Sequence, residues 1–216
     1  MDILTKPLTV FTFESIQALV KENHQEGIEL DYKEEFPDKA KLSQTVAAFA
    51  NTRGGVILVG VKENRENGRP VKAEGIADGH HDEFVAQVIG NITPIPAYEY
   101  YKTNDMDGKV FLLIRVFEGN ETPYYSHNDS NIWIRTGSIK KPVEIASPEH
   151  AELLFKKAER ALLGRKLNAA LAEGNFKSFL ISAEKERQFE LATERQEYDN
   201  KRTQHEDGDS MGPFKS

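Results

Sequence analysis

The sequence predicts one domain that mixes helices and strands, followed by a long helical extension. The first observation is the stretch over 26–62, where an alternating segment, a helical pattern, a Gly-Gly pair and a short apolar run follow one another. The second is a return to short β-type segments after residue 97, and the third is a charged, helix-favouring composition beyond residue 148. A chain of 216 residues has room for one domain of about 100–150 residues and an appendage.

The stretch over 26–62 predicts a strand, a helix and a buried strand. Residues 28–33 alternate apolar and polar side chains, which is typical of a half-buried strand with carboxylates and an amine on its polar face. Residues 39–52 place apolar residues at helical spacing, and Gly54-Gly55 follows where such a helix would end. The apolar run over 56–61 is too short and too β-branched for a helix, so we expect a central, buried strand.

The segments before residue 97 predict three further features. Helices are expected over 13–23 and 81–92, where apolar residues recur at helical spacing. The residues over 62–68 are polar and end in glycine, so we expect a turn that leads into a hairpin strand at 70–76.

The segments after residue 97 predict β-structure and then a helix. Strands are expected over 98–102 and 109–116, on either side of an Asp-Gly hairpin signal at 107–108, and again over 131–135. Ser147-Pro148-Glu149 is typical of an N-cap, a first-position proline and an acidic first turn, so a helix begins there.

The predicted organisation has four parts. These are an N-terminal arm over 1–12, a domain over 13–163, a helical extension over 164–203 and a disordered tail over 204–216. The extension carries few apolar residues in its later part, which favours a solvated or self-associating helix.

Composition excludes several classes of protein. The sequence has no cysteine, which rules out disulfides, a thiolate nucleophile and cysteine zinc sites. No apolar run approaches the roughly 18 residues that a membrane span needs, and no signal-peptide pattern opens the chain. We therefore expect a cytoplasmic protein without a membrane partner.

Charge is distributed unevenly along the chain. The net charge of -7 argues against nucleic acid, because phosphate binding depends largely on lysine and arginine. However, residues 135–166 hold eight basic and four acidic residues, whereas residues 26–38 hold six acidic residues and one lysine. Such an acidic spot and basic segment could bind metal and phosphates together, or both could be solvated surface.

Four blocks of the sequence carry a family resemblance. They read EGIELDYK over 26–33, AFANTRGG over 48–55, LVGVKE over 58–63 and WIRTGS over 133–138. In this order they resemble the Schlafen AlbA_2 domain, whose pattern runs E-x4-E-F-K, A-F-A-N-T-x-G-G, I-G-V-D-D and Y-x-R-x-G-S before a helix opened by Ser-Pro-Glu. The resemblance covers about 13–160.

The resemblance implies an α/β (α+β) fold, with a mixed β-sheet flanked by helices, and an association with DNA or RNA. In animal Schlafens and some bacterial relatives, paired domains form a horseshoe that cleaves structured RNA such as tRNA with a carboxylate triad and a divalent metal. Carried over by position, the metal ligands are Glu26, Asp31 and Glu63, and these residues with Lys33 form the catalytic set. Asp31 replaces Glu, Glu63 replaces Asp, and Lys62 stands where a carboxylate is common.

The residues themselves support the same chemistry less sharply. Mg and Mn prefer oxygen ligands, and a metal can activate water and stabilise charge on a phosphodiester. We therefore expect Mg or Mn as cofactor, with the alternative that these acids only neutralise nearby lysines. The residues predicted to contact nucleic acid are basic: Lys33, Arg53, Lys62, Arg135, Lys140 and Lys141.

Several side chains have two interpretations. Arg135 could contact phosphate or clamp the acidic strand. Gly54-Gly55 could cradle a phosphate, but a helix C-cap is more common, and we expect Asn51 to cap the same helix end. His24 is a remote general-base candidate, and the tyrosines of 98–101 could stack bases or pack across strands.

Three functions remain open at this point. The first is a metal-dependent endoribonuclease, the second a non-catalytic DNA- or RNA-binding regulator, and the third an interaction module that oligomerises through its C-terminal helices. A homodimer is expected, because the chain has one such domain where catalytic relatives use two. ATP hydrolysis is disfavoured because the sequence has no Walker A motif.

Overall fold

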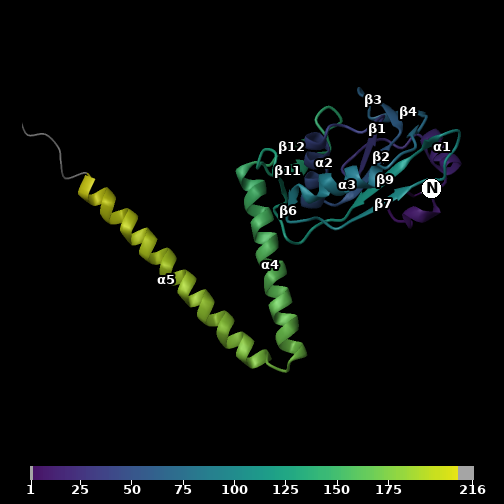
Figure 1. The fold of residues 1–216 in the computed structure, drawn as a ribbon. Coiled ribbons are helices and arrows are strands. Elements are labelled where there is room, and N and C mark those ends of the chain that lie inside the picture. Colours follow the sequence, from purple (N-terminus) through teal and green to yellow (C-terminus); the bar gives the residue numbers. More distant parts are fainter. Residues whose placement is uncertain (1, 209–216) are drawn as a thin grey trace, which may run out of the picture. The chain divides into compact units, whose positions relative to one another are not determined.

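The computed structural model describes residues 2–208 and divides the chain into two units, Met1–Ala161 and Leu162–Ser216, which we describe separately (Figure 1). The helices are η1 (Leu8–Val10), α1 (Phe13–Lys21), α2 (Lys39–Asn51), α3 (His81–Gly90), α4 (Pro148–Ala172) and α5 (Phe176–Gly208). The predicted tail over 204–216 begins inside α5, and its residues 209–216 lie outside the described part of the chain.

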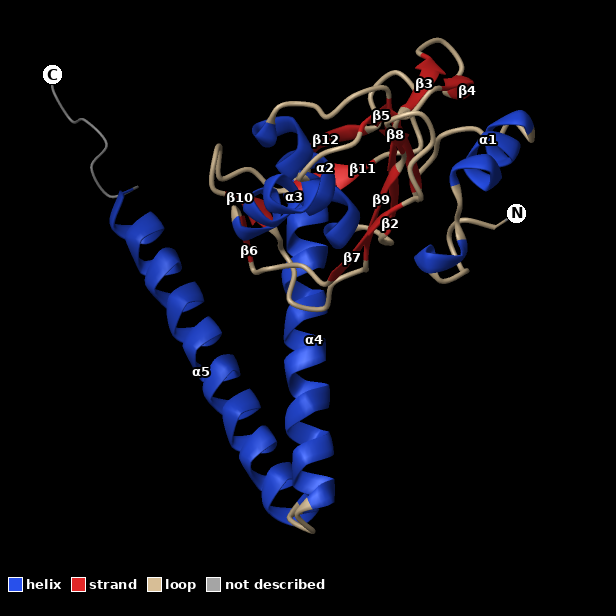
Figure 2. Cartoon of the chain, turned by 45° about the vertical axis from the view of Figure 1, so that its right-hand side comes forward, coloured by secondary structure: helices blue, strands red, loops and turns tan. Residues whose placement is uncertain are grey.

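A four-stranded mixed sheet forms the centre of the first unit (Figure 2). Its order is β1 (Leu30–Lys33), β2 (Gly55–Val59), β9 (Leu112–Val116) and β7 (Tyr98–Lys102). Strands β1 and β2 run parallel, whereas β9 is antiparallel to both of its neighbours. This arrangement confirms the predicted α/β class with a mixed sheet.

Four short antiparallel pairs surround that sheet. They are β3 (Val61–Asn64) with β4 (Arg69–Ala73), β5 (Ile76–Ala77) with β8 (Lys109–Val110), β6 (Ile92–Thr93) with β10 (Tyr125–Ser126), and β11 (Trp133–Arg135) with β12 (Val143–Ile145).

Two apolar cores lie on opposite faces of the sheet. Helices α2 and α3 cover one face, where Ile57 and Val59 of β2 join the core. Helix α1 and the N-terminal segment cover the other, where Val56 and Leu58 join the second core. Since all four side chains are fully buried, β2 is the predicted central strand, and its continuous apolar run reflects burial on both faces.

The residues on either side of β2 differ from the prediction in two places. The buried run over 56–61 is broken at Gly60, whose φ of 103° turns the chain from β2 into β3. Residues 62–64 of the polar stretch therefore belong to β3, and its turn is confined to 65–68. The N-terminal arm is also more closely packed than expected, since Ile3, Leu8 and Phe11 are buried.

The second unit is helical in its described residues. It contains the end of α4 and all of α5, with the turn between them at 173–175. At the start of α4, in the first unit, Ser147 Oγ accepts a hydrogen bond from the His150 amide at 3.3 Å, as its N-cap motif predicts. No helix in the described part of the chain is long and apolar enough to cross a membrane.

Candidate functional site

A buried ion pair joins two of the sequence blocks. Arg135 on β11 donates from Nη1 to Oδ1 of Asp31 on β1 at 2.8 Å, and the two side chains are 0% and 1% exposed. Arg135 Nη2 donates to the carbonyls of Gly27 at 2.6 Å and Leu30 at 3.2 Å. Its guanidinium also lies 4.6 Å from the ring centroid of Phe49. This burial favours the clamping role and leaves Arg135 no access to phosphate.

Asn51 and Thr52 position the strand that carries Arg135. The Asn51 amide donates to the carbonyls of Tyr124 at 2.7 Å and Trp133 at 2.9 Å, and its oxygen accepts from the Tyr124 amide at 2.7 Å. Thr52 Oγ1 accepts from the Arg135 amide at 3.0 Å. The prediction that Asn51 caps the helix is wrong, because its side chain joins α2 to two distant segments.

The glycines after α2 allow close backbone packing. The Gly54 amide donates to the Phe49 carbonyl at 2.8 Å, and Gly54 has a φ of 70°. A Cβ at this position would lie 2.6 Å from the Val116 carbonyl oxygen. Since the Gly54 amide is used inside the protein, the helix-end interpretation accounts for it better than a phosphate cradle.

Glu26 lies next to the ion pair and is itself buried. Its backbone amide donates to Gly68 at 2.7 Å, and its carboxyl accepts a hydrogen bond from the amide of Tyr32. Burial raises the pKa of Glu26 to about 9, helped by a hydrogen bond with Glu63 and by the negative charge of Asp31. The Glu26 carboxyl therefore carries a proton at neutral pH, and the three predicted metal ligands lie together.

Lys33 occupies the remaining oxygen of Asp31. Its Nζ lies 2.5 Å from Asp31 Oδ2, and the lysine side chain is 26% exposed. Oδ2 is buried, and the Lys33 ammonium is its ion-pair partner. Lys33 instead donates to the Tyr32 carbonyl at 3.3 Å. Two cations thus neutralise the one buried Asp31 carboxylate.

The predicted metal has no prepared place in this arrangement. Within residues 2–208, no group of three or more Asp, Glu or His side chains is placed to hold a metal ion. The Asp31 carboxylate already contacts Lys33 and Arg135. The carboxyl cluster, meaning Glu26, Asp31 and Glu63, therefore does not fit Mg or Mn as its side chains stand.

Two loops with basic side chains meet beside the carboxyl cluster. Gly68 ends the β3–β4 turn, and a Cβ built there would lie 3.3 Å from Glu26 Cβ and 3.3 Å from Ile139 Cγ2 of the β11–β12 loop. The exposed basic residues of the two loops, with Arg69 at the start of β4, form what we call the basic rim: Arg65, Arg69, Lys140 and Lys141. Neither arginine was among the predicted contacts, although the R-E-N-G-R run at 65–69 was their signal.

Two predicted phosphate contacts lie elsewhere. Arg53 is exposed in a small hollow that Glu29 and Glu118 also line. Lys62 faces a different pocket and pairs with Glu34 at 3.0 Å. The structure thus brings the carboxyl cluster, Lys33 and the basic rim together, and separates them from these two residues.

The remaining candidates have contacts within the protein that account for them. His24 is exposed and pairs with Glu22 at 3.1 Å. Tyr100 packs against the core beneath α2 and α3, and Tyr101 packs against the opposite core. Packing of the β7 tyrosines therefore accounts for these two better than base stacking does.

Comparisons with known proteins agree with the motif assignment. The family described as Schlafen, AlbA_2 matches residues 26–144, which is more than half of the chain. Comparison with curated proteins gives no match.

Two solved structures are similar at low identity. The DIP2311 protein from Corynebacterium diphtheriae is 19% identical, with a TM-score of 0.40 over 61% of this chain and 25% of that chain. The N-terminal domain of a RecG-related protein from Nitrosomonas europaea is 21% identical, with a TM-score of 0.42 over 54% of this chain and 80% of that one. The chain thus spans about a quarter of the DIP2311 chain. On the extent of the family match, the chain belongs to the Schlafen AlbA_2 family.

Proposed function

We propose that this chain binds nucleic acid, DNA or RNA, through the basic rim beside the carboxyl cluster. Membership of the Schlafen AlbA_2 family carries the proposal, since it supports a nucleic-acid-related function. The basic rim is the surface that supports this proposal best. Its guanidinium and ammonium groups come from two segments, 65–69 and 140–141, that are far apart in the sequence and adjacent in space.

The electrostatics of the rim suit a phosphate backbone despite the net charge of -7. Arg65, Arg69, Lys140 and Lys141 are exposed. Lys141 pairs with Glu144 at 3.3 Å, and the two side chains are 69% and 38% exposed. A pair this exposed contributes at most about 1 kcal/mol, so a phosphate can replace Glu144 as partner of the lysine.

Cleavage of structured RNA such as tRNA is the second candidate. One observation favours it, namely that Glu26 and Glu63 contact each other beside Asp31. Mg or Mn is the cofactor predicted for that reaction. Since the cluster does not fit a metal as it stands, we derive no catalytic step from it.

Binding is tested by fluorescence anisotropy with tRNA and with duplex DNA, between 50 and 200 mM salt. We expect the double variant Lys140→Gln, Lys141→Gln to bind at least tenfold more weakly and to lower the salt slope by about two. Arg53→Gln is the matched control, because Arg53 lies in a separate hollow, and it should keep the wild-type affinity. Equal binding by the rim variant and the wild type would remove the basis of the proposal.

Cleavage is tested on the same tRNA with and without Mn. Glu63→Gln is the informative variant, since Glu63 is only half-buried and its loss spares the buried ion pair. Mn-dependent cleavage that this variant abolishes supports the ribonuclease. Absence of cleavage by the wild-type protein, with tRNA binding retained, leaves the chain a binding module.

A further inference from the structure

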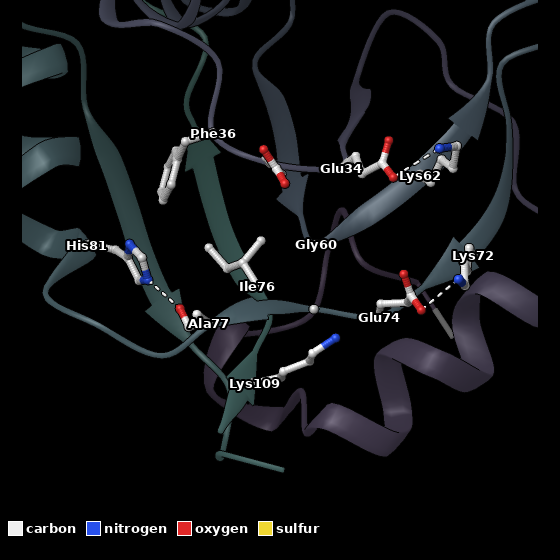
Figure 3. Close-up of a pocket in the computed structure, with 12 residues that line it drawn as sticks. Glu34, Phe36, Gly60, Lys62, Lys72, Glu74, Ile76, Ala77, His81 and Lys109 are labelled. Atoms are coloured by element: carbon white, nitrogen blue, oxygen red, sulfur yellow. Dashed lines mark hydrogen bonds and ion pairs between the residues drawn. The ribbon is translucent and has the colours of Figure 1, made fainter. Parts of the chain in front are cut away.

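An open pocket of about 450 Å³ lies outside the carboxyl cluster, in the first unit (Figure 3). It is formed by the β3–β4 pair, the β5–β8 pair, the segment that follows β1 and the first residue of α3. Pockets of about 300–1,000 Å³ are the usual size for small ligands. Its lining divides into a charged side and an apolar side.

Three lysines occupy the charged side together with three glutamates, Glu34, Glu35 and Glu74. Lys62 and Lys72 lie directly opposite each other in the β3–β4 pair, and like charges in such a position destabilise the strand pairing. Lys62 pairs with Glu34 at 3.0 Å and Lys72 with Glu74 at 2.7 Å. Figure 3 shows the Lys109 ammonium in the same pocket, and this group has no ion-pair partner in the part of the chain that the structure describes.

Glu74 lies within the electrostatic influence of all three lysines. Its hydrogen bond to Lys72, with the positive charges of Lys72, Lys109 and Lys62, lowers the pKa of its carboxyl. An anion at this point therefore experiences three ammonium groups. Both acids of the pocket's ion pairs are at least half exposed, so these pairs are weak, and a phosphate of higher charge can exchange for a carboxylate.

The opposite side of the pocket is apolar and aromatic. Phe36 and Ile76 are half-buried there, and the ring centroid of Phe36 lies 5.4 Å from that of His81 and 4.9 Å from that of Phe84. His81 Nε2 donates to the Ala77 carbonyl at 2.9 Å. Flat heterocycles stack on such aromatic surfaces.

We propose that this pocket binds a phosphorylated nucleoside, with its phosphate among Lys62, Lys72 and Lys109 and its base against Phe36. The three lysines and the aromatic side chains line one pocket of about 450 Å³, which is large enough for a nucleotide. The lysines alone would fit any phosphate and the aromatic side alone any flat ring, so the two together favour a nucleotide. The source is either a free nucleotide or the phosphorylated end of a nucleic-acid strand. Only the second source rests on the proposed function.

The test follows amide chemical shifts of the full-length protein during titration with AMP, adenosine, inorganic phosphate and a 5′-phosphorylated tetranucleotide. AMP should shift the pocket resonances with saturation, and adenosine or phosphate alone should bind at least tenfold more weakly. Lys109→Gln should weaken AMP binding by about tenfold. Lys21→Gln, an exposed lysine at the end of α1, is the matched control and should bind AMP as the wild type does.

The outcomes separate this site from the nucleic-acid function. Tighter binding of the tetranucleotide than of AMP identifies a strand end, whereas equal affinity identifies a free nucleotide. Equal effects of AMP and adenosine, or unchanged AMP affinity in Lys109→Gln, overturn the proposal. If neither ligand binds the pocket while tRNA binding still depends on the basic rim, the pocket proposal alone fails.

Discussion

Replacement of Arg135 by methionine removes one cation from the carboxyl cluster and keeps most of the side-chain volume. Asp31 is 1% exposed and Arg135 is 0% exposed, so water cannot compensate for the loss. Removal of one partner from a buried ion pair costs about 3–5 kcal/mol, because the other charge is left without its partner. Lys33 at 2.5 Å retains part of the compensation, which favours the lower end of that range.

The assay is urea unfolding followed by circular dichroism, with a thermal scan alongside. A domain of this size loses about 2–4 °C in melting temperature per kcal/mol, so Arg135→Met should melt roughly 6–20 °C below the wild type. Arg65→Met is the control, since Arg65 is exposed, and its effect should stay within about 0.5 kcal/mol.

A double-mutant cycle isolates the pair itself. Asp31→Asn removes the buried charge, so adding Arg135→Met to it should cost at least about 1.5 kcal/mol less than adding it to the wild type. Additive effects of the two substitutions, or a loss below about 1 kcal/mol for Arg135→Met alone, would refute the clamping role.

Three further predictions concern stability. Burial raises the pKa of Glu26, so the folded protein binds this proton more tightly than the unfolded chain does. The free energy of unfolding should therefore fall as the pH rises from about 4.5 to about 9, by at most about 1.4 kcal/mol per pH unit. The urea midpoint of Glu26→Gln should fall less than that of the wild type over the same range. Gly60→Ala should destabilise by about 1–3 kcal/mol in the same assay, because φ is 103° and its Cβ would lie 2.7 Å from backbone, whereas Gly164→Ala in α4 should be neutral or stabilising. Asn51→Ala should cost about 2–4 kcal/mol through three lost hydrogen bonds, and a loss under about 1 kcal/mol would contradict its bridging role.

The central sheet was predictable because its signals are local. Continuous apolar residues specify a strand buried on both faces, and β2 is such a strand. Helical spacing likewise located α2 at Lys39–Asn51, within one residue of the predicted end. The strand β3 was not predictable, because Lys62, Glu63 and Asn64 favour a turn by composition and become a strand only by pairing with β4.

The candidate site was predictable only in part. Residue types and a family pattern pointed to the carboxyl cluster, and the structure brings its members together. The roles of Arg135 and Asn51 depend on contacts with residues 104 and 73 positions away in the chain, which no local pattern reveals. The pocket likewise depends on contacts between distant residues, since three separate strands supply Lys62, Lys72 and Lys109.

The blocks that identify the family form one connected set of contacts. Thr52 at the end of α2 accepts from the backbone of Arg135, and Arg135 crosses to Asp31 on β1. Glu26 completes the set, since it accepts from the Tyr32 amide and contacts Glu63. A sequence that keeps these blocks therefore keeps the architecture around a buried ion pair, whether or not it cleaves nucleic acid. The blocks predict the position of the site. The basic rim tests nucleic-acid binding and Glu63 tests cleavage, so these groups around the buried ion pair distinguish a nuclease from a binding module.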